Sequence, residues 1–180
     1  MLRVLLVNNA LSAQARLISL IHRCGWQLSQ QVSTLSAACI QLNQAGAELV
    51  LVDIPSQEET ALSQLAEMAA KFPDTYFLFW ISKKPNAELS ARNVIVCLRP
   101  LRLDGVLKQI SEQAPELLQR SPKLRNLAEQ IRQIAQAKRV LIESGMSEDE
   151  AHHTLEKMAM NQRISRCEAA LQVIKTYQQE

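Results

Sequence analysis

The chain has 180 residues, of which 47% are hydrophobic, enough for one large or two small folded domains. Its 20 Lys and Arg residues and 18 Asp and Glu residues leave a net charge of +2, which excludes a polybasic or polyacidic protein. No apolar run has the roughly 20 residues needed to cross a bilayer, and no signal peptide is recognisable, so we expect a cytoplasmic protein with no membrane partner.

The first half of the sequence alternates short apolar runs with amphipathic helical patterns. Continuous apolar runs predict strands that are buried on both faces, at 2–7, 48–53, 76–81 and 94–98. A strand with a weaker apolar pattern is predicted at 28–33. Helices are expected between and after them, at 12–24, 35–45, 56–71, 103–113 and, short and poorly formed, at 86–92. The third of these begins with the capping-box spacing Ser56 to Glu59. This order predicts an α/β fold, a flavodoxin-like doubly wound sheet of five β-then-α units over residues 1–114.

Polar residues stand at the predicted ends of several strands. Ligands of doubly wound sheets bind at the carboxyl ends of the strands. The candidate site residues at those ends are Asn8, Asn9, Asp53, Ser82 and Arg99.

A long helix is predicted to follow Ser121 and Pro122, an N-cap residue with proline at the first helical position. Apolar residues then recur at alternating spacings of three and four, interrupted only by Lys138; they are Leu124, Leu127, Ile131, Ile134 and Leu141. Such a seam either packs on its own domain or pairs two chains in a coiled coil. We favour a homodimer because the stripe is narrow and its flanks are polar, with residues 115–134 as linker and coiled-coil helix.

The last part of the sequence, residues 135–180, predicts a small three-helix all-α domain. Gly145 is expected to end the long helix in the left-handed conformation. Ser147 with Glu150, and Ser165 with Glu168, have capping-box spacing and predict two further helix starts. Helices this short are not stable alone, so the three must pack on one another.

The first half of the sequence resembles the receiver domain of bacterial response regulators. The resemblance implies that Asp53 is equivalent to the phosphate acceptor and Ser82 to the Ser or Thr after the fourth strand. Asn8 and Asn9 replace the two acids that hold Mg²⁺, and Arg99 replaces a Lys. Neutral amides are poor substitutes for carboxylate ligands of a hard cation, and Arg is not equivalent to Lys. We expect an inactive pseudo-receiver, with Asp53 a solvated carboxylate, controlled by a sensor protein or ligand rather than by phosphate.

The second half resembles the ANTAR module, the RNA-binding domain of AmiR- and NasR-type transcription antiterminators. The motifs that carry the resemblance are Ala137-Lys138, Val140-Leu141-Ile142, Ser147 to Ala151, Leu155 to Met160 and Ala170 to Ile174. It implies that the protein binds stem-loops in an mRNA leader and so prevents formation of a terminator hairpin.

Cations and amides in this module are the candidate RNA-binding residues, because RNA is recognised through its phosphates and the base edges of its loops. They are Lys138, Arg139, Lys157, Asn161, Gln162, Arg163 and Arg166. Each of them, taken singly, also fits an ordinary solvated position on a helix. Lys138 is the strongest candidate because it interrupts an apolar stripe, although it could instead set the register of a coiled coil.

Two other functions remain open: a phosphorylated response regulator with an RNA-binding output, and a module that binds another protein. The chain has no recognisable catalytic motif, so we expect neither an enzyme nor a cofactor. His152 and His153 point in directions about 100° apart on a helix, which favours surface residues over a metal pair. The four cysteines are too widely spaced for a metal site, and we expect buried reduced thiols.

Overall fold

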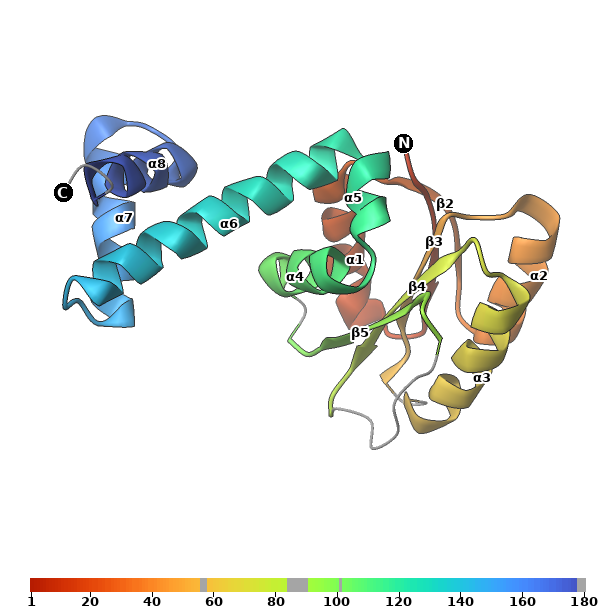
Figure 1. Ribbon diagram of the computed structural model, residues 1–180. Coiled ribbons are helices and arrows are strands. Elements are labelled where there is room, and N and C mark those ends of the chain that lie inside the picture. Colours follow the sequence, from red (N-terminus) through yellow and green to blue (C-terminus); the bar gives the residue numbers. More distant parts are fainter. Residues whose placement is uncertain (56–57, 84–90, 101, 178–180) are drawn as a thin grey trace. The chain divides into compact units, whose positions relative to one another are not determined.

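The computed structural model describes residues 1–55, 58–83, 91–100 and 102–177, without the side chain of Glu59 (Figure 1). The chain divides into two compact units, Met1–Arg125 and Asn126–Glu180. The division lies inside the segment expected to be a linker. Most of the helix predicted at 86–92 and the capping box predicted from Ser56 lie outside the described residues.

The first unit contains a five-stranded parallel sheet in the order β2-β1-β3-β4-β5, which confirms the predicted doubly wound, flavodoxin-like fold. Its strands are β1 (Arg3–Asn8), β2 (Gln27–Val32), β3 (Leu49–Asp53), β4 (Tyr76–Ile81) and β5 (Val94–Leu98). β3 and all of β4 except half-buried Tyr76 are buried, as their uninterrupted apolar sequences require. β2, at one edge of the sheet, has a more polar sequence and more exposed residues.

Helices cover both faces of this sheet (Figure 1). α1 (Leu11–Cys24) and α4 (Leu103–Gln113) lie on one face, and α2 (Leu35–Ala45) and α3 (Glu58–Lys71) lie on the other. Alternate residues of each strand therefore serve different cores; Phe77, Phe79 and Ile81 of β4, for example, pack in the core cluster that α2 and α3 cover. A short helix, α5 (Pro115–Arg120), follows α4.

The strand register brings the polar residues at the carboxyl ends of the strands to one edge of the sheet. Asn8 is paired directly with Asp53 in the β1–β3 ladder, and Ile81 with Leu98 in the β4–β5 ladder. Ser82 and Arg99 follow those last two residues, so they also lie at the carboxyl edge of the sheet. This placement is the one predicted from the sequence.

α6 (Pro122–Glu143) begins in the first unit and continues into the second, where α7 (Glu148–Gln162) and α8 (Arg166–Tyr177) complete a three-helix core. The Ser121 hydroxyl accepts the N–H of Leu124 at 3.3 Å, as expected of an N-cap. The core cluster of the second unit includes the buried residues Ala137, Leu141, Ala151, Leu155, Ala170, Val173 and Ile174. None of the described helices is long and apolar enough to span a membrane.

Both predicted capping boxes of the second unit are present. The Ser147 hydroxyl accepts the Glu150 N–H at 3.3 Å, and the Glu150 carboxylate accepts the Ser147 N–H at 2.8 Å. Ser165 and Glu168 repeat the pattern at 3.2 and 2.8 Å. These reciprocal bonds lower the pKa of both glutamates below the ordinary value. The helix starts are therefore determined by residues close in sequence, as predicted.

The predicted apolar seam of α6 is divided between the two units. Leu124 is buried in the first unit, and Leu141 is buried in the core of the second, against which Ile134 also packs. Leu127 and Ile131 are half-buried. Packing within the chain thus buries both ends of the stripe, and the residues in its middle keep part of their apolar surface exposed.

Burial of the cysteines is only partly as expected. Cys24 and Cys97 are buried, and desolvation raises the pKa of each thiol to about 12. The expectation is wrong for Cys39 and Cys167, which are half-buried. The Cys167 thiol lies 2.9 Å from Oε1 of Gln133.

Candidate functional site

The carboxylate at the end of β3 is buried and paired. Asp53 is 1% exposed, and its Oδ1 forms an ion pair with the guanidinium of Arg99. The Asn8 amide donates to Oδ2 and to the main-chain oxygen of Asp53, at 3.4 Å in each case. The expectation that Asp53 is solvated is therefore wrong: burial of a carboxylate requires such partners, and Arg99 supplies the charge.

A second carboxylate, which the sequence interpretation missed, joins Ser82 to this group. Glu58, the first residue of α3, accepts the N–H of Ser82 at Oε2 and its hydroxyl at Oε1, each at 2.9 Å. Nε of Arg99 lies 3.4 Å from Oε1 of Glu58. Burial raises the pKa of Glu58, but the hydrogen bonds from Ser82 and Arg99 outweigh this effect, and the pKa lies below the ordinary value.

Arg99 thus bridges two carboxylates, Asp53 and Glu58. Glu58 stands only a few residues after the end of β3, at the same edge of the sheet as Asp53. Its position in the sequence could therefore have identified it as a candidate site residue. The local pattern predicts only a capping box from Ser56 to Glu59, in which Glu58 has no part. Asn9 is exposed at the same edge.

The donors around Asp53 differ from those that hold a divalent cation. The amide nitrogen of Asn8, rather than its oxygen, faces the Asp53 carboxylate, and the Asn8 oxygen accepts the N–H of Ala10 at 3.1 Å. A guanidinium occupies the remaining side of the carboxylate. Mg²⁺ requires oxygen ligands, so the arrangement favours an internal ion pair over a metal and phosphate. Among the described residues, no cluster of three or more His, Cys, Asp or Glu could hold a metal.

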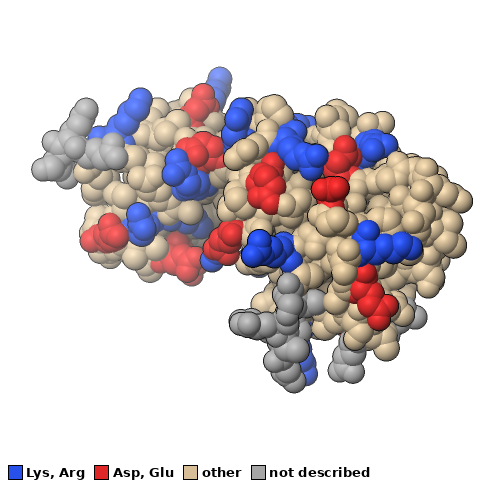
Figure 2. All heavy atoms as spheres, turned by 45° about the vertical axis from the view of Figure 1, so that its right-hand side comes forward, with Lys and Arg blue, Asp and Glu red and all other residues tan. Residues whose placement is uncertain are grey.

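Among the described residues, some of the Lys and Arg side chains predicted to bind RNA form ion pairs with glutamates, and others do not. Arg139 lies 3.8 Å from Glu143, and Arg166 lies 3.5 Å from Glu156, which also contacts His152 and His153. No described acid forms an ion pair with the remaining three, Lys138, Lys157 and Arg163. Lys138 is half-buried and the other two are exposed. Figure 2 shows both signs of charge interspersed on the face it displays, so a binding surface must depend on local placement.

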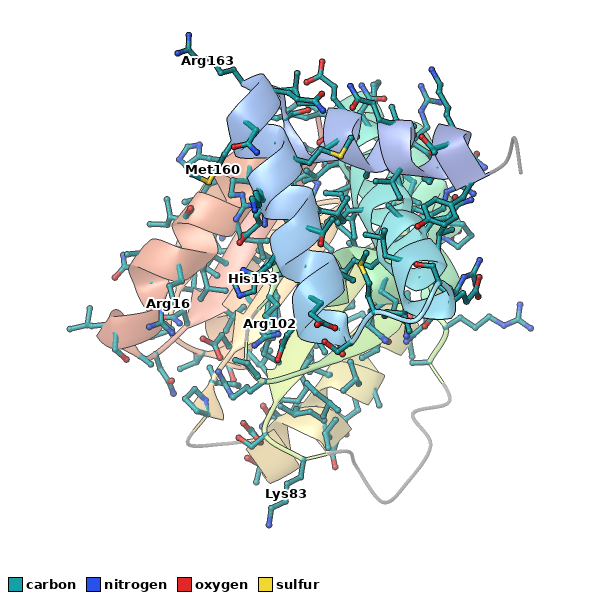
Figure 3. The ribbon with its side chains drawn as sticks, turned by 90° about the vertical axis from the view of Figure 1, so that its left-hand side faces the viewer. Arg16, Lys83, Arg102, His153, Met160 and Arg163 are labelled. Atoms are coloured by element: carbon teal, nitrogen blue, oxygen red, sulfur yellow. The ribbon has the colours of Figure 1, made fainter. Side chains whose placement is uncertain are left out.

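Candidate RNA-binding residues gather on the last turns of α7. Lys157, Asn161, Gln162 and Arg163 are all exposed. Met160, which the sequence interpretation did not single out as a contact, lies among them and is 78% exposed. Figure 3 shows Met160 and Arg163 projecting outward from α7. The structure thus places one apolar and several polar or basic side chains together at this end of the helix.

Comparisons with known proteins agree with the fold and identify the second unit. Residues 122–174 match the ANTAR domain family. A structure of the Salmonella typhimurium response regulator RcsB is 13% identical with a TM-score of 0.51, covering 97% of this chain and 89% of that one. Another, of two RcsB dimers bound to two parallel DNAs, is 11% identical with a TM-score of 0.50, covering 96% and 97%.

A receiver domain gives a weaker structural match. That of the Erythrobacter litoralis response regulator PhyR is 17% identical with a TM-score of 0.48, covering 62% of this chain and 88% of that one. At these identities the structural similarity concerns the fold alone. No curated protein matches the chain. The chain therefore contains an ANTAR domain match over residues 122–174, and its fold is similar to that of response-regulator structures.

Proposed function

We propose that this protein is a transcription antitermination regulator whose output is RNA binding. The ANTAR match over residues 122–174 is the observation that carries the proposal. In this proposal the domain binds stem-loops in an mRNA leader and prevents a terminator hairpin from forming. The exposed cations and amides of α7 support it, since such groups engage RNA phosphates and the base edges of loops.

The receiver-like domain acts, in this proposal, as a partner- or ligand-controlled input rather than a phosphorylated one. Its support is the ion pair of Arg99 with Asp53, which occupies the carboxylate that a phosphodonor would have to modify. Phosphoryl transfer further depends on a metal to neutralise the developing charge, and Asn8 offers an amide where a carboxylate would be needed. A sensor protein or a small ligand would then shift the activity of the RNA-binding end.

The active species is proposed to be a homodimer. Leu127 and Ile131 are the remaining partly exposed residues of the α6 stripe, and the polar side chains of Glu129 and Arg132 form an ion pair beside them at 2.9 Å. An apolar strip with charged flanks is the pattern of a short coiled-coil contact.

Selection from a pool of hairpin RNAs with randomised loops tests the RNA output. The intact chain should enrich a common loop sequence, with affinity that falls as salt is raised because phosphate contacts release counterions. Lys138→Ala should weaken binding about tenfold, and Lys175→Ala, which removes a cation near the end of α8, should not.

The same selection separates the rival functions. Equal or tighter binding to the enriched hairpins made as DNA would replace the RNA output with a DNA output. Failure to enrich any hairpin would favour the protein-interaction alternative.

A further inference from the structure

Three helices of this chain end with the same hydrogen-bond pattern. At the ends of α1, α6 and α7, one N–H bonds to the carbonyl three residues back and the next N–H to the carbonyl five residues back. The residues that carry the first of these N–H groups are Gly25, Gly145 and Arg163. All three have positive φ, at 70°, 106° and 53°. This is the Schellman arrangement, in which the left-handed residue is usually Gly.

Arg163 is unusual at such a position. It is the one non-glycine residue with positive φ among the described residues. The left-handed conformation is unfavourable for a side chain that bears a Cβ. At Gly145 a Cβ would meet nothing within 4 Å, so the backbone conformation, rather than lack of space, accounts for glycine there. The fold alone would therefore favour glycine at 163 as well.

The Arg163 side chain forms no ion pair with a described acid that would offset the cost of this backbone conformation. It is exposed instead. The neighbouring Arg166 is the contrasting case, since it lies 3.5 Å from Glu156. A strained residue with an unused charge suggests a role outside the fold.

Arg163 has exposed apolar and polar neighbours on the last turns of α7. Met160, one turn earlier, exposes 78% of its surface, and Figure 3 shows it projecting outward from α7, as Arg163 does. Lys157 and Asn161 are exposed on the same turns. An apolar, polarisable side chain offers a base a surface to pack on, while a guanidinium binds phosphate with paired N–H donors.

We propose that the α7–α8 turn is the loop-reading element of the RNA site, with Arg163 binding a loop phosphate and Met160 packing on an adjacent unpaired base. The proposal rests on the RNA-binding function proposed above and assigns that function to particular side chains. It also explains why Arg stands where the backbone favours Gly.

Arg163→Gly separates the structural role of this residue from its binding role. In the intact chain the variant should melt at the same temperature as the wild type or higher, because glycine accommodates the positive φ. Its affinity for a hairpin RNA selected by the wild type should fall about tenfold, the loss expected for one charge-assisted contact. Arg163→Asn, whose side chain also tolerates the left-handed region, should behave likewise. Met160→Gln should weaken binding to the hairpin while leaving binding to a fully paired RNA duplex unchanged.

Lys175→Ala is the matched control, because Lys175 is an exposed cation near the far end of α8. Wild-type affinity in both Arg163 variants, with a hairpin that the wild type binds, would overturn the assignment of the turn while leaving RNA binding intact. A fall in the melting temperature of both Arg163 variants would also overturn it, since the side chain would then stabilise the turn. Failure of the wild type to select any hairpin would overturn the RNA function itself.

Discussion

Arg99 forms its ion pair with Asp53 across the end of an intervening strand. Arg99 follows β5 and Asp53 ends β3, with β4 between them in the sheet. The same guanidinium lies 3.4 Å from Glu58, which holds the N–H and hydroxyl of Ser82. One cation therefore links the ends of three strands at the carboxyl edge of the sheet.

Arg99→Met should lower the free energy of unfolding of the first unit by about 2 kcal/mol, because it leaves a buried carboxylate without one of its partners. Both tryptophans of the chain, Trp26 and Trp80, are buried in this unit, so their fluorescence during urea unfolding reports on it. Arg102→Met is the control, since Arg102 is exposed and no described acid forms an ion pair with it; its effect should stay within about 0.5 kcal/mol. Equal stability of the two variants would contradict a stabilising ion pair.

The stability of the first unit should fall at acid pH partly through Glu58. The pKa of Glu58 is lower in the folded chain than its ordinary value, so the unfolded chain binds the proton first as pH falls. Its contribution is complete above the ordinary Glu pKa and is lost as pH falls through the folded value. Urea unfolding at a series of pH values should show a shallower acid slope for Glu58→Gln, and an unchanged slope for Glu67→Gln on an exposed part of the same helix.

Introducing acids at the carboxyl edge of the sheet should introduce metal-dependent phosphorylation of Asp53. The triple variant Asn8→Asp, Asn9→Asp, Arg99→Lys supplies carboxylate ligands for Mg²⁺ and frees Asp53 from the guanidinium. With acetyl phosphate and Mg²⁺ it should gain an acid-stable, base-labile phosphate that Asp53→Asn removes. The wild-type chain should show no such label. Labelling of the wild type at Asp53 would support the phosphorylated response regulator instead.

Ile131→Asp should weaken self-association, because a charge in the middle of an apolar helix contact must be desolvated. Sedimentation velocity at a series of protein concentrations measures the change. Gln130→Asp introduces the same charge at a neighbouring exposed position and should leave the dimer intact. A wild-type chain that remains monomeric at high concentration would refute the homodimer.

The elements that the sequence predicted well depend on short-range patterns. Buried strands have continuous apolar runs, and the helix starts at Ser147 and Ser165 need only an acid three residues later. The edge that joins Asn8 to Asp53 could also be predicted, because parallel strands align their carboxyl ends.

Features that depend on the folded chain could not be predicted in the same way. The link from Glu58 to Ser82 joins residues far apart in sequence, and the local pattern beside Glu58 predicts only a helix start, with Glu59 as its acid. The apolar stripe of α6 does not reveal that Leu124 and Leu141 are buried in different units. Arg163 carries no sequence signal for a left-handed residue, whereas Gly145 does.

The most direct test of the account is the affinity of the intact wild-type chain for its selected hairpin RNA, measured by fluorescence anisotropy before and after incubation with acetyl phosphate and Mg²⁺. The account predicts tight, salt-dependent binding with the same Kd in both states, because the output is RNA binding and Arg99 occupies Asp53. A phosphate-dependent change in Kd that Asp53→Asn abolishes, or no binding in either state, would contradict it.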